Sequence, residues 1–177
     1  QLVGQKLPVI YVNNGSDYLD LIEAPQILDN LIAQRTIPPL IAVFIPPIDL
    51  QEDYIFNDAY TSFLADELVP FIQQTYDVTT EPESTGIMGS AMGGLAAVYT
   101  GVSRPDVFGL VAGQSGMYGA GGDLLFQQLE SQRAGLANLD RIRFYLVAGS
   151  YETAVGGDHE AGNILAANQR LAKTLTQ

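Results

Sequence analysis

Short runs of apolar, largely β-branched residues recur along the chain, separated by longer segments with helical spacing. The first two runs, residues 7–12 and 39–45, are almost continuously apolar and are bounded by Pro, Asn and Gly. This pattern is typical of strands that are buried on both faces of a parallel sheet. Further strands are predicted at residues 85–89, at 109–112 and, with alternating polarity, at 142–148.

The segments between these runs carry apolar residues at the three- and four-residue spacing of amphipathic helices. One helix is expected around Ile27, Leu28, Leu31 and Ile32, and a second presents Tyr60, Phe63, Leu64, Leu68 and Phe71 on one face. Asn57 or Asp58 is the expected N-cap of the second helix, and Pro70 should kink that helix or end its regular part. Three more helices are expected at residues 95–100, within 123–133 and at 164–175.

Strands that alternate with helices predict an α/β fold, with a mostly parallel central sheet and helices on both faces. With 177 residues and 47% hydrophobic content, the chain is long enough for one domain and too short for two ordinary ones. We therefore expect residues 1–177 to form a single domain. Ligands of such sheets bind at the carboxyl ends of the strands, so the loops there are the candidates for chemistry.

Charge and composition narrow the range of partners. A formal net charge of −12 argues against a nucleic acid or an anionic membrane as partner, and a neutral or cationic small ligand is easier to accommodate. The absence of Cys excludes disulfides and thiolate chemistry, and it leaves the compartment open. No apolar run reaches the roughly 18 residues that span a bilayer, so we expect a soluble protein of unknown location.

The segment 86–95 carries the most specific chemical signal. A strand-to-helix turn that presents a reactive Ser needs Gly two residues before and two residues after it, because a Cβ at either place would clash. Gly89 and Gly93 bracket position 91, which is Ala. Ser90 cannot substitute, since Met occupies both of its corresponding positions. The segment therefore has the pattern of a nucleophile turn in which the nucleophile is missing. The alternative is a pair of glycines that only allows close packing of the helix on the strand.

Other short motifs accompany this turn in a fixed order. They are Leu7-Pro8-Val9-Ile10-Tyr11-Val12 with Asn14-Gly15, Glu52-Asp53-Tyr54, Asn57, Tyr60, Phe63-Leu64, Glu67-Leu68-Val69-Pro70, Tyr76, Arg104-Pro105-Asp106-Val107-Phe108-Gly109, Gln114-Ser115-Gly116, and Gly149 with Glu152. Together with the turn, they resemble the putative-esterase branch of the α/β-hydrolases, which includes esterase D-like enzymes and enterochelin esterases. The resemblance runs from about Leu7 to Leu175, and it implies an α/β-hydrolase fold and a serine carboxylesterase activity.

The resemblance implies a catalytic Ser, an acid and a His in that chain order. Ala91 stands at the Ser position and Glu152 at the acid position, where the alternative is an ordinary loop glutamate. The family His lies in a later Gly-Gly-His-Asp type segment that the sequence does not reach. His159, the only His, precedes the last predicted helix and is interpreted as a loop or helix-cap residue. With one His and no Cys, we expect no transition-metal site, although Asp158 and Glu160 flank it.

The resemblance also implies an oxyanion hole of backbone N–H groups, which survives the loss of the serine oxygen. Its expected donors are Met92, Gly15 and Ser16. The candidate substrate-binding residues are Asn14, Tyr54, Gln114 and Ser115, although the segment around Gln114 and Ser115 is equally well explained as a packing motif of the family. No cofactor is implied.

The leading interpretation is a carboxylic ester hydrolase with an acyl-enzyme mechanism, inactive as written because Ala91 replaces the nucleophile and the catalytic His is absent. The alternatives are a natural pseudoenzyme or ligand-binding protein of the same fold and, less favoured, a purely structural module. A small-molecule ester is the expected substrate, of unspecified identity. Because the family normally carries further strands before Leu7 and after Leu175, we expect a domain truncated at both ends. Its open sheet edges would favour a homo-oligomer or a complementing chain.

Overall fold

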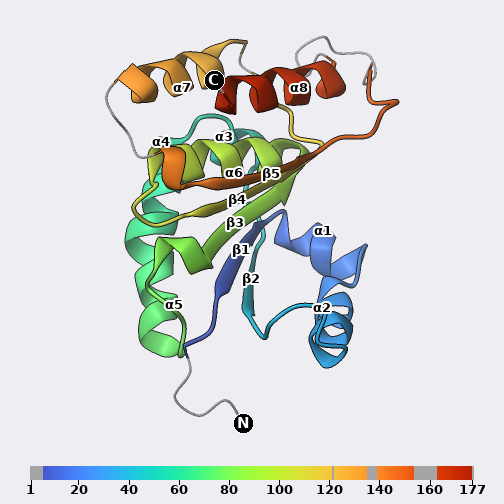
Figure 1. Cartoon of the computed structure of the whole chain (residues 1–177), viewed down its shortest axis with the longest axis vertical. Coiled ribbons are helices and arrows are strands. Elements are labelled where there is room, and N and C mark those ends of the chain that lie inside the picture. Colours follow the sequence, from blue (N-terminus) through green and yellow to red (C-terminus); the bar gives the residue numbers. More distant parts are fainter. Residues whose placement is uncertain (1–5, 121, 135–138, 154–162, 177) are drawn as a thin grey trace.

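The computed structural model describes residues 6–120, 122–134, 139–153 and 163–176. Its described part contains one parallel five-stranded sheet with strand order β2-β1-β3-β4-β5 (Figure 1). The strands are β1 Val9–Asn13, β2 Ile41–Ile45, β3 Thr85–Ser90, β4 Leu110–Gln114 and β5 Arg143–Val147. Each overlaps one of the predicted apolar runs. The expected α/β fold with a parallel central sheet is therefore confirmed.

Helices cover both faces of this sheet. They are α1 Gly15–Asp20, α2 Ala24–Ala33, α3 Leu50–Tyr54, α4 Asp58–Ser62, α5 Val69–Thr75, α6 Ala91–Ser103, α7 Leu124–Ala134 and α8 Ile164–Leu175, with a π-helical segment η1 Phe63–Leu68 and 3-10 turns η2 Pro82–Ser84 and η3 Leu139–Arg141. Figure 1 shows α6, α7 and α8 on one side of the sheet, and α1 and α2 on the other. No helix in the described ranges is long and apolar enough to cross a membrane.

The main core lies between the sheet and α6. Residues 93–102 of α6 are all buried, so this helix is surrounded by protein along most of its length. From the sheet, alternate strand residues such as Val9, Tyr11 and Ile87 point into the core, as the two-residue period of a strand requires. Leu125 of α7 and Leu171 of α8 belong to the same cluster and are fully buried.

Of the two edge strands, only β2 departs from the expected burial. Residues 41–44 of β2 are only half-buried, so the prediction that this strand is buried on both faces is wrong. The reason is its place at the sheet edge, which leaves one side without a neighbouring strand. At the opposite edge, β5 alternates between exposed and half-buried residues, in agreement with its predicted alternation.

The helical run from α4 through η1 to α5 is continuous, and it begins at Asn57, whose Oδ1 accepts a hydrogen bond from the backbone N–H of Tyr60 (3.0 Å). The π-helical turn directly precedes Pro70, which has no N–H to donate to the preceding turn. Because a π turn takes more residues than an α turn, the residues after it are rotated relative to the predicted face. Phe71 is accordingly 60% exposed, whereas Leu64 is buried.

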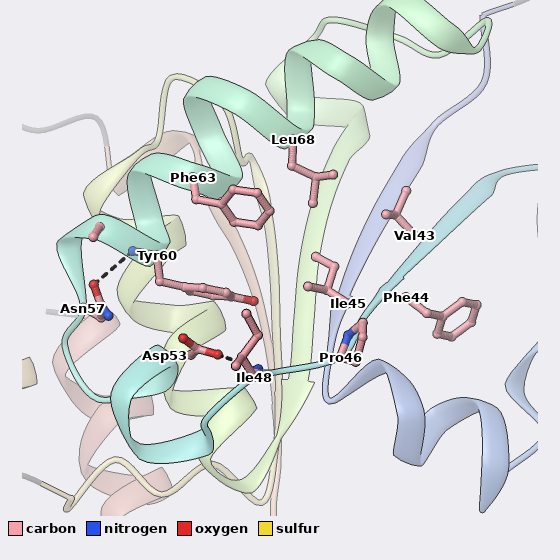
Figure 2. A pocket seen from close by; sticks show the side chains of 11 residues that line it. Val43, Phe44, Ile45, Pro46, Ile48, Asp53, Asn57, Tyr60, Phe63 and Leu68 are labelled. Carbon is pink, nitrogen blue, oxygen red and sulfur yellow. Dashed lines mark hydrogen bonds between the residues drawn. The ribbon is translucent and has the colours of Figure 1, made fainter.

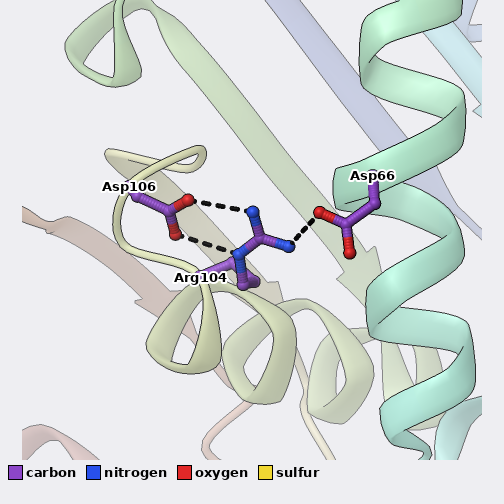
Figure 3. Close-up of polar contacts among 3 residues, drawn as sticks. All are labelled: Asp66, Arg104 and Asp106. Atoms are coloured by element: carbon purple, nitrogen blue, oxygen red, sulfur yellow. Dashed lines mark hydrogen bonds and ion pairs between the residues drawn. The ribbon is translucent and has the colours of Figure 1, made fainter.

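An ion-pair cluster joins this run to the end of α6 (Figure 3). The Arg104 guanidinium, at the C-terminal cap of α6, donates two hydrogen bonds to Asp106 (3.0 and 2.9 Å) and one to Asp66 of η1 (2.6 Å). The Arg104 hydrogen bond holds the pKa of the Asp106 carboxyl below its usual value. Because the carboxylates are largely exposed, the ion pairs add little to the free energy of unfolding. Their main effect is to orient the helical run relative to the end of α6.

Tyr11 provides a test of this core. Its side chain is fully buried, its hydroxyl has no hydrogen-bond partner among the described residues, and burial raises its pKa from 10.0 to about 12. A raised pKa in the folded state contributes stability that is complete below pH 10 and is lost as the pH rises toward 12. We therefore expect Tyr11→Phe to leave the unfolding free energy near pH 8 unchanged or slightly higher. Between pH 8 and pH 11, the unfolding free energy of Tyr11→Phe should decrease by about 1 kcal/mol less than that of the parent chain.

Urea denaturation of the two proteins at both pH values measures this difference. Tyr76→Phe, which alters an exposed tyrosine, is the matched control and should show the same decrease in unfolding free energy as the parent chain. An equal decrease in the parent chain and in Tyr11→Phe would contradict the raised pKa of Tyr11.

Candidate active site

The turn between β3 and α6 has the geometry of a tight strand-to-helix connection. Ser90 ends the strand in an extended conformation, and Ala91 begins the helix with a φ of 49°. This left-handed region is unfavourable for residues with a Cβ, and at a non-Gly residue it indicates stored strain. The backbone at Ala91 therefore holds its side chain at the exit of the strand, in a conformation that the surrounding packing must enforce.

Two glycines make the turn possible. A Cβ on Gly89 would overlap the backbone carbonyl group of Gly93, and a Cβ on Gly93 would overlap the side chain of Asn14. The expectation that no Cβ fits is thus confirmed at Gly89, where backbone atoms block it, whereas at Gly93 the obstacle is the side chain of Asn14. The same contacts show that the end of β3, the first turn of α6 and the loop after β1 are packed directly on one another.

Three adjacent strands end in the same unusual way. Asn14 follows β1, Ala91 follows β3 and Ser115 follows β4, with φ values of 57°, 49° and 50°. The strands are in register at Val12 with Met88, and at Ser90 with Gln114, so these three residues lie side by side at the carboxyl edge of the sheet. The structure therefore brings together predicted site residues from separate parts of the chain.

Buried tyrosines hold the loop after β1. The Tyr54 hydroxyl accepts a hydrogen bond from the backbone N–H of Asn14 (2.8 Å), and the Tyr60 hydroxyl donates to Oδ1 of Asn13 (2.7 Å). The Asn13 side chain in turn donates from Nδ2 to the carbonyl of Gly93 in α6 (3.1 Å). This chain of contacts links α3 and α4 to the first turn of α6 through the end of β1.

Burial raises the pKa of both phenols, most strongly that of Tyr60, so each remains a neutral hydrogen-bonding group. At Tyr54 the Asn14 N–H hydrogen bond opposes this effect without cancelling it. Tyr54 is 1% exposed. This burial places its hydroxyl behind Asn14 as a support, and its role in substrate binding stays a prediction.

The predicted oxyanion donors belong to the first turns of two helices. Met92 follows Ala91 in α6, and Gly15 and Ser16 open α1. First-turn N–H groups have no acceptor within their own helix, so they are free to bind an external oxygen. Close by, the buried Oδ1 of Asn14 has no partner among the described residues. The role of these groups in binding an oxyanion stays a prediction.

Glu152, the predicted acid, is held by two donors. Its Oε1 accepts the Ser115 hydroxyl hydrogen bond (2.9 Å), and its Oε2 accepts the backbone N–H of Gly149 (2.8 Å). The backbone of Glu152 is also tied to α8, because its carbonyl accepts the N–H of Leu165 (3.0 Å). The hydroxyl of Ser115 is therefore engaged by Glu152, and the carboxylate has a fixed orientation beside the end of β4.

Gln114 is oriented by a second contact that spans the sheet edge. Its Oε1 accepts a hydrogen bond from the hydroxyl of Tyr18 in α1 (2.6 Å). Burial raises the pKa of Tyr18. The amide of Gln114 is thereby directed toward α1, and its role in substrate binding stays a prediction.

Sequence reasoning missed the polar roles of Asn13, Tyr18 and Tyr60. The helical spacing places Tyr60 on an apolar helix face, and the one signal of a polar role is its hydroxyl, which a Phe or Leu at that position would lack. His159 lies outside the described residues. Within the described ranges, no group of three or more His, Cys, Asp or Glu residues could hold a metal ion.

Comparison with known proteins identifies a matching family and several relatives. The family model described as Putative esterase matches residues 2–176. The iron(III) enterobactin esterase of Escherichia coli K12 is 26% identical over 157 residues, which are 85% of this chain and 39% of that protein. The uncharacterized protein YbbA of Bacillus subtilis is 26% identical over 127 residues, covering 63% of this chain and 50% of that protein. The chain thus spans half or less of the length of these relatives.

Solved structures of esterases superimpose on this chain. The enterobactin esterase of Shigella flexneri, crystallised in the presence of enterobactin, superimposes with a TM-score of 0.84 at 25% identity, over 99% of this chain and 44% of that one. A ferulic acid esterase has a TM-score of 0.73 at 16% identity, over 97% of this chain and 73% of that one, and shows likeness of fold alone. The sheet described above is therefore that of an α/β-hydrolase.

The packing at the turn predicts a sharp contrast between two glycines of one strand. Gly89→Ala should destabilise the protein by about 2–3 kcal/mol, since its Cβ meets backbone atoms that no side-chain rotation can move. Gly86→Ala is the matched control, because its Cβ would lie 3.5 Å from Ile10 and Leu110, in ordinary contact. Urea denaturation measures both. Equal costs at the two positions would show that the turn is not constrained as described.

Proposed function

Since the chain belongs to the putative esterase family, we propose that it carries the site of a serine-type carboxylic ester hydrolase in which Ala91 replaces the nucleophile. The turn at Ala91 supports this proposal most directly, through its φ of 49° between two glycines that have no room for a Cβ. Ser would fit there without a change of backbone, because Ala91 already carries a Cβ. Without an oxygen at this position the chain forms no acyl-enzyme, and we propose that it is inactive as written.

With Ser at position 91, the reaction would follow the acyl-enzyme route. The serine oxygen attacks the ester carbonyl and loses its proton to a general base, and the carbonyl oxygen becomes an oxyanion held by the N–H groups of Met92, Gly15 and Ser16. The alcohol leaves with that proton. Water then attacks the acyl-enzyme by the same route in reverse and releases the acid.

Glu152 is the residue that we propose orients the base. An acid that positions an imidazole must itself be held, and the Glu152 carboxylate accepts hydrogen bonds from Ser115 and from the Gly149 N–H. The family resemblance implies a His as the base. In this proposal Ser115 contributes by fixing the carboxylate, and a direct contact with substrate is secondary.

The substrate class follows from the family and from charge. Relatives named enterobactin esterases cover most of this chain, which supports a small-molecule ester as ligand. The formal net charge of −12 disfavours strongly anionic esters unless positive groups accompany them. We therefore propose a neutral or cationic ester, bound with its carbonyl toward the first turn of α6.

A second candidate function is ligand binding by a natural pseudoenzyme. The observation that favours it is Ala91 itself, which stands within an otherwise ordered site: the hydrogen bonds of Tyr54 and Tyr60 behind the loop after β1 do not depend on a nucleophile. Such a protein would bind a carbonyl or carboxylate at the first turns of α1 and α6 without turning it over.

Restoring the missing oxygen separates the two functions. With imidazole in the buffer as the general base, we expect Ala91→Ser to react covalently with a fluorophosphonate probe at position 91, and to hydrolyse p-nitrophenyl acetate at least about tenfold faster than the parent chain in the same buffer. The reason is that the turn raises the reactivity of a serine only at its apex. Intact-mass and peptide mass spectrometry locate the adduct, and absorbance at the nitrophenolate band gives the rate.

Two controls accompany this experiment. Ser90→Ala in the Ala91→Ser background should keep the adduct, because Ser90 lies in the strand and outside the apex. The parent chain should show no adduct despite containing Ser90. A folded Ala91→Ser protein that gains neither adduct nor hydrolysis would overturn the hydrolase proposal in favour of the pseudoenzyme.

A further inference from the structure

Asn13, the last residue of β1, has a fully buried side chain whose two polar ends are both engaged. Its Oδ1 accepts a hydrogen bond from the Tyr60 hydroxyl (2.7 Å), and its Nδ2 donates to the carbonyl of Gly93 (3.1 Å). A carbonyl oxygen can only accept, so the Nδ2 end of the amide must face Gly93. The Oδ1 end then faces Tyr60, whose hydroxyl must donate. The two contacts together fix the orientation of the Asn13 amide.

Tyr60 brings this contact from a separate part of the chain. Figure 2 shows its side chain extending from α4 toward the sheet, and its backbone N–H hydrogen-bonded to Asn57 at the start of that helix (3.0 Å). Its hydroxyl also hydrogen-bonds to the hydroxyl of Tyr54. The single proton of Tyr60 is donated to Asn13, so Tyr54 is the donor in that pair. Tyr54 in turn accepts the N–H of Asn14 (2.8 Å). One row of hydrogen bonds therefore runs from the loop after β1, through the two phenols and Asn13, to the first turn of α6.

The two ends of this row lie beside the two predicted arms of the oxyanion hole. Asn14 directly precedes Gly15 and Ser16. At the other end, Gly93 directly follows Met92. An oxyanion is stabilised only when its donors all lie about 2.7–3.1 Å from one point, so the two arms must be held at a set separation. The arms belong to different helices, and the hydrogen bond from the end of β1 to the first turn of α6 joins them across 80 residues of sequence.

Stability alone does not explain an amide at position 13. A buried hydrogen-bonded pair adds little net stability compared with apolar groups of the same shape, because both partners lose their hydrogen bonds to water on folding. Leu shares the branched outline of Asn, and Phe shares the ring of Tyr, so an apolar pair could occupy positions 13 and 60. Apolar contact is not directional, however, and it would not set a fixed distance to the carbonyl of Gly93.

We propose that Asn13 is a positioning residue of the oxyanion hole, and that its amide sets the separation between the donor on α6 and the donors on α1. The proposal rests on the esterase function proposed above, and it assigns to Asn13 no contact with substrate. It also makes oxyanion stabilisation depend on α4, because Tyr60 holds the amide in place.

The test compares an ester with its sulfur analogue in the Ala91→Ser background, with imidazole in the buffer as the general base. N–H donors bind an oxyanion more strongly than the sulfur anion formed from a C=S group, so a well-placed hole favours p-nitrophenyl acetate over p-nitrophenyl thionoacetate. We expect Asn13→Leu to lower kcat/KM for the acetate at least about tenfold. The acetate-to-thionoacetate ratio of kcat/KM should also fall at least about threefold, toward the ratio that imidazole gives without protein.

A double variant separates positioning from folding. Asn13→Leu alone leaves the Tyr60 hydroxyl buried without its acceptor, which destabilises the protein. Asn13→Leu combined with Tyr60→Phe removes both polar groups, so its urea midpoint should lie closer to that of the parent chain while the lower ratio persists. The matched control is Thr61→Val combined with Thr100→Val, which removes another buried hydrogen bond between α4 and α6 (3.2 Å), in the C-terminal half of α6. This control should leave the ratio unchanged.

Three outcomes would contradict a positioning role for Asn13. If Ala91→Ser with Asn13 intact gives neither adduct nor hydrolysis, the esterase proposal fails and the role of Asn13 fails with it. If Ala91→Ser is active and both Asn13 variants keep its rate and its ratio, the positioning role alone is overturned. A lower rate with an unchanged ratio also overturns that role, because it indicates a general distortion of the site.

Discussion

The close contact between the end of β3 and the first turn of α6 is the constraint on which the rest of the site depends. At Gly89 there is no space for a single additional carbon atom, because the carbonyl group of Gly93 occupies it. This contact fixes where α6 starts, and it forces the residue between strand and helix into the left-handed region. The position of the apex is thus a consequence of backbone packing and does not depend on which side chain stands there.

The loops on either side complete this arrangement through hydrogen bonds that cross long distances in sequence. Asn13 connects α6 to Tyr60, and Tyr54 accepts from Asn14, so the loop after β1 is held against the apex from behind. On the other side Ser115 and Gly149 hold Glu152. Because the partners on the β1 side are buried, their hydrogen bonds are protected from competition by water, whereas the bond from Gly149 is exposed.

The strands and most helices could be predicted because alternation and spacing of apolar residues report directly on which side chains must be buried. The same patterns could not show that β2 is an edge strand, since side-chain polarity does not reveal whether a neighbour is present. They could not show that Phe71 turns outward, because the π-helical turn before Pro70 shifts the helix face without any change in composition. The spacing of glycines around Ala91 revealed the turn, whereas the tyrosine contacts depend on pairs 40 and 47 residues apart and leave no local signal.

An Ala at position 91 is energetically less favourable than a Gly would be. A residue with a Cβ in the left-handed conformation costs about 1–2 kcal/mol, and Gly would avoid most of this cost. A site selected only for stability therefore gains from Gly at this position. Ala91 keeps both the strained backbone and the Cβ, and it differs from Ser by one oxygen atom alone. The backbone at position 91 is therefore the one that the proposed serine nucleophile requires.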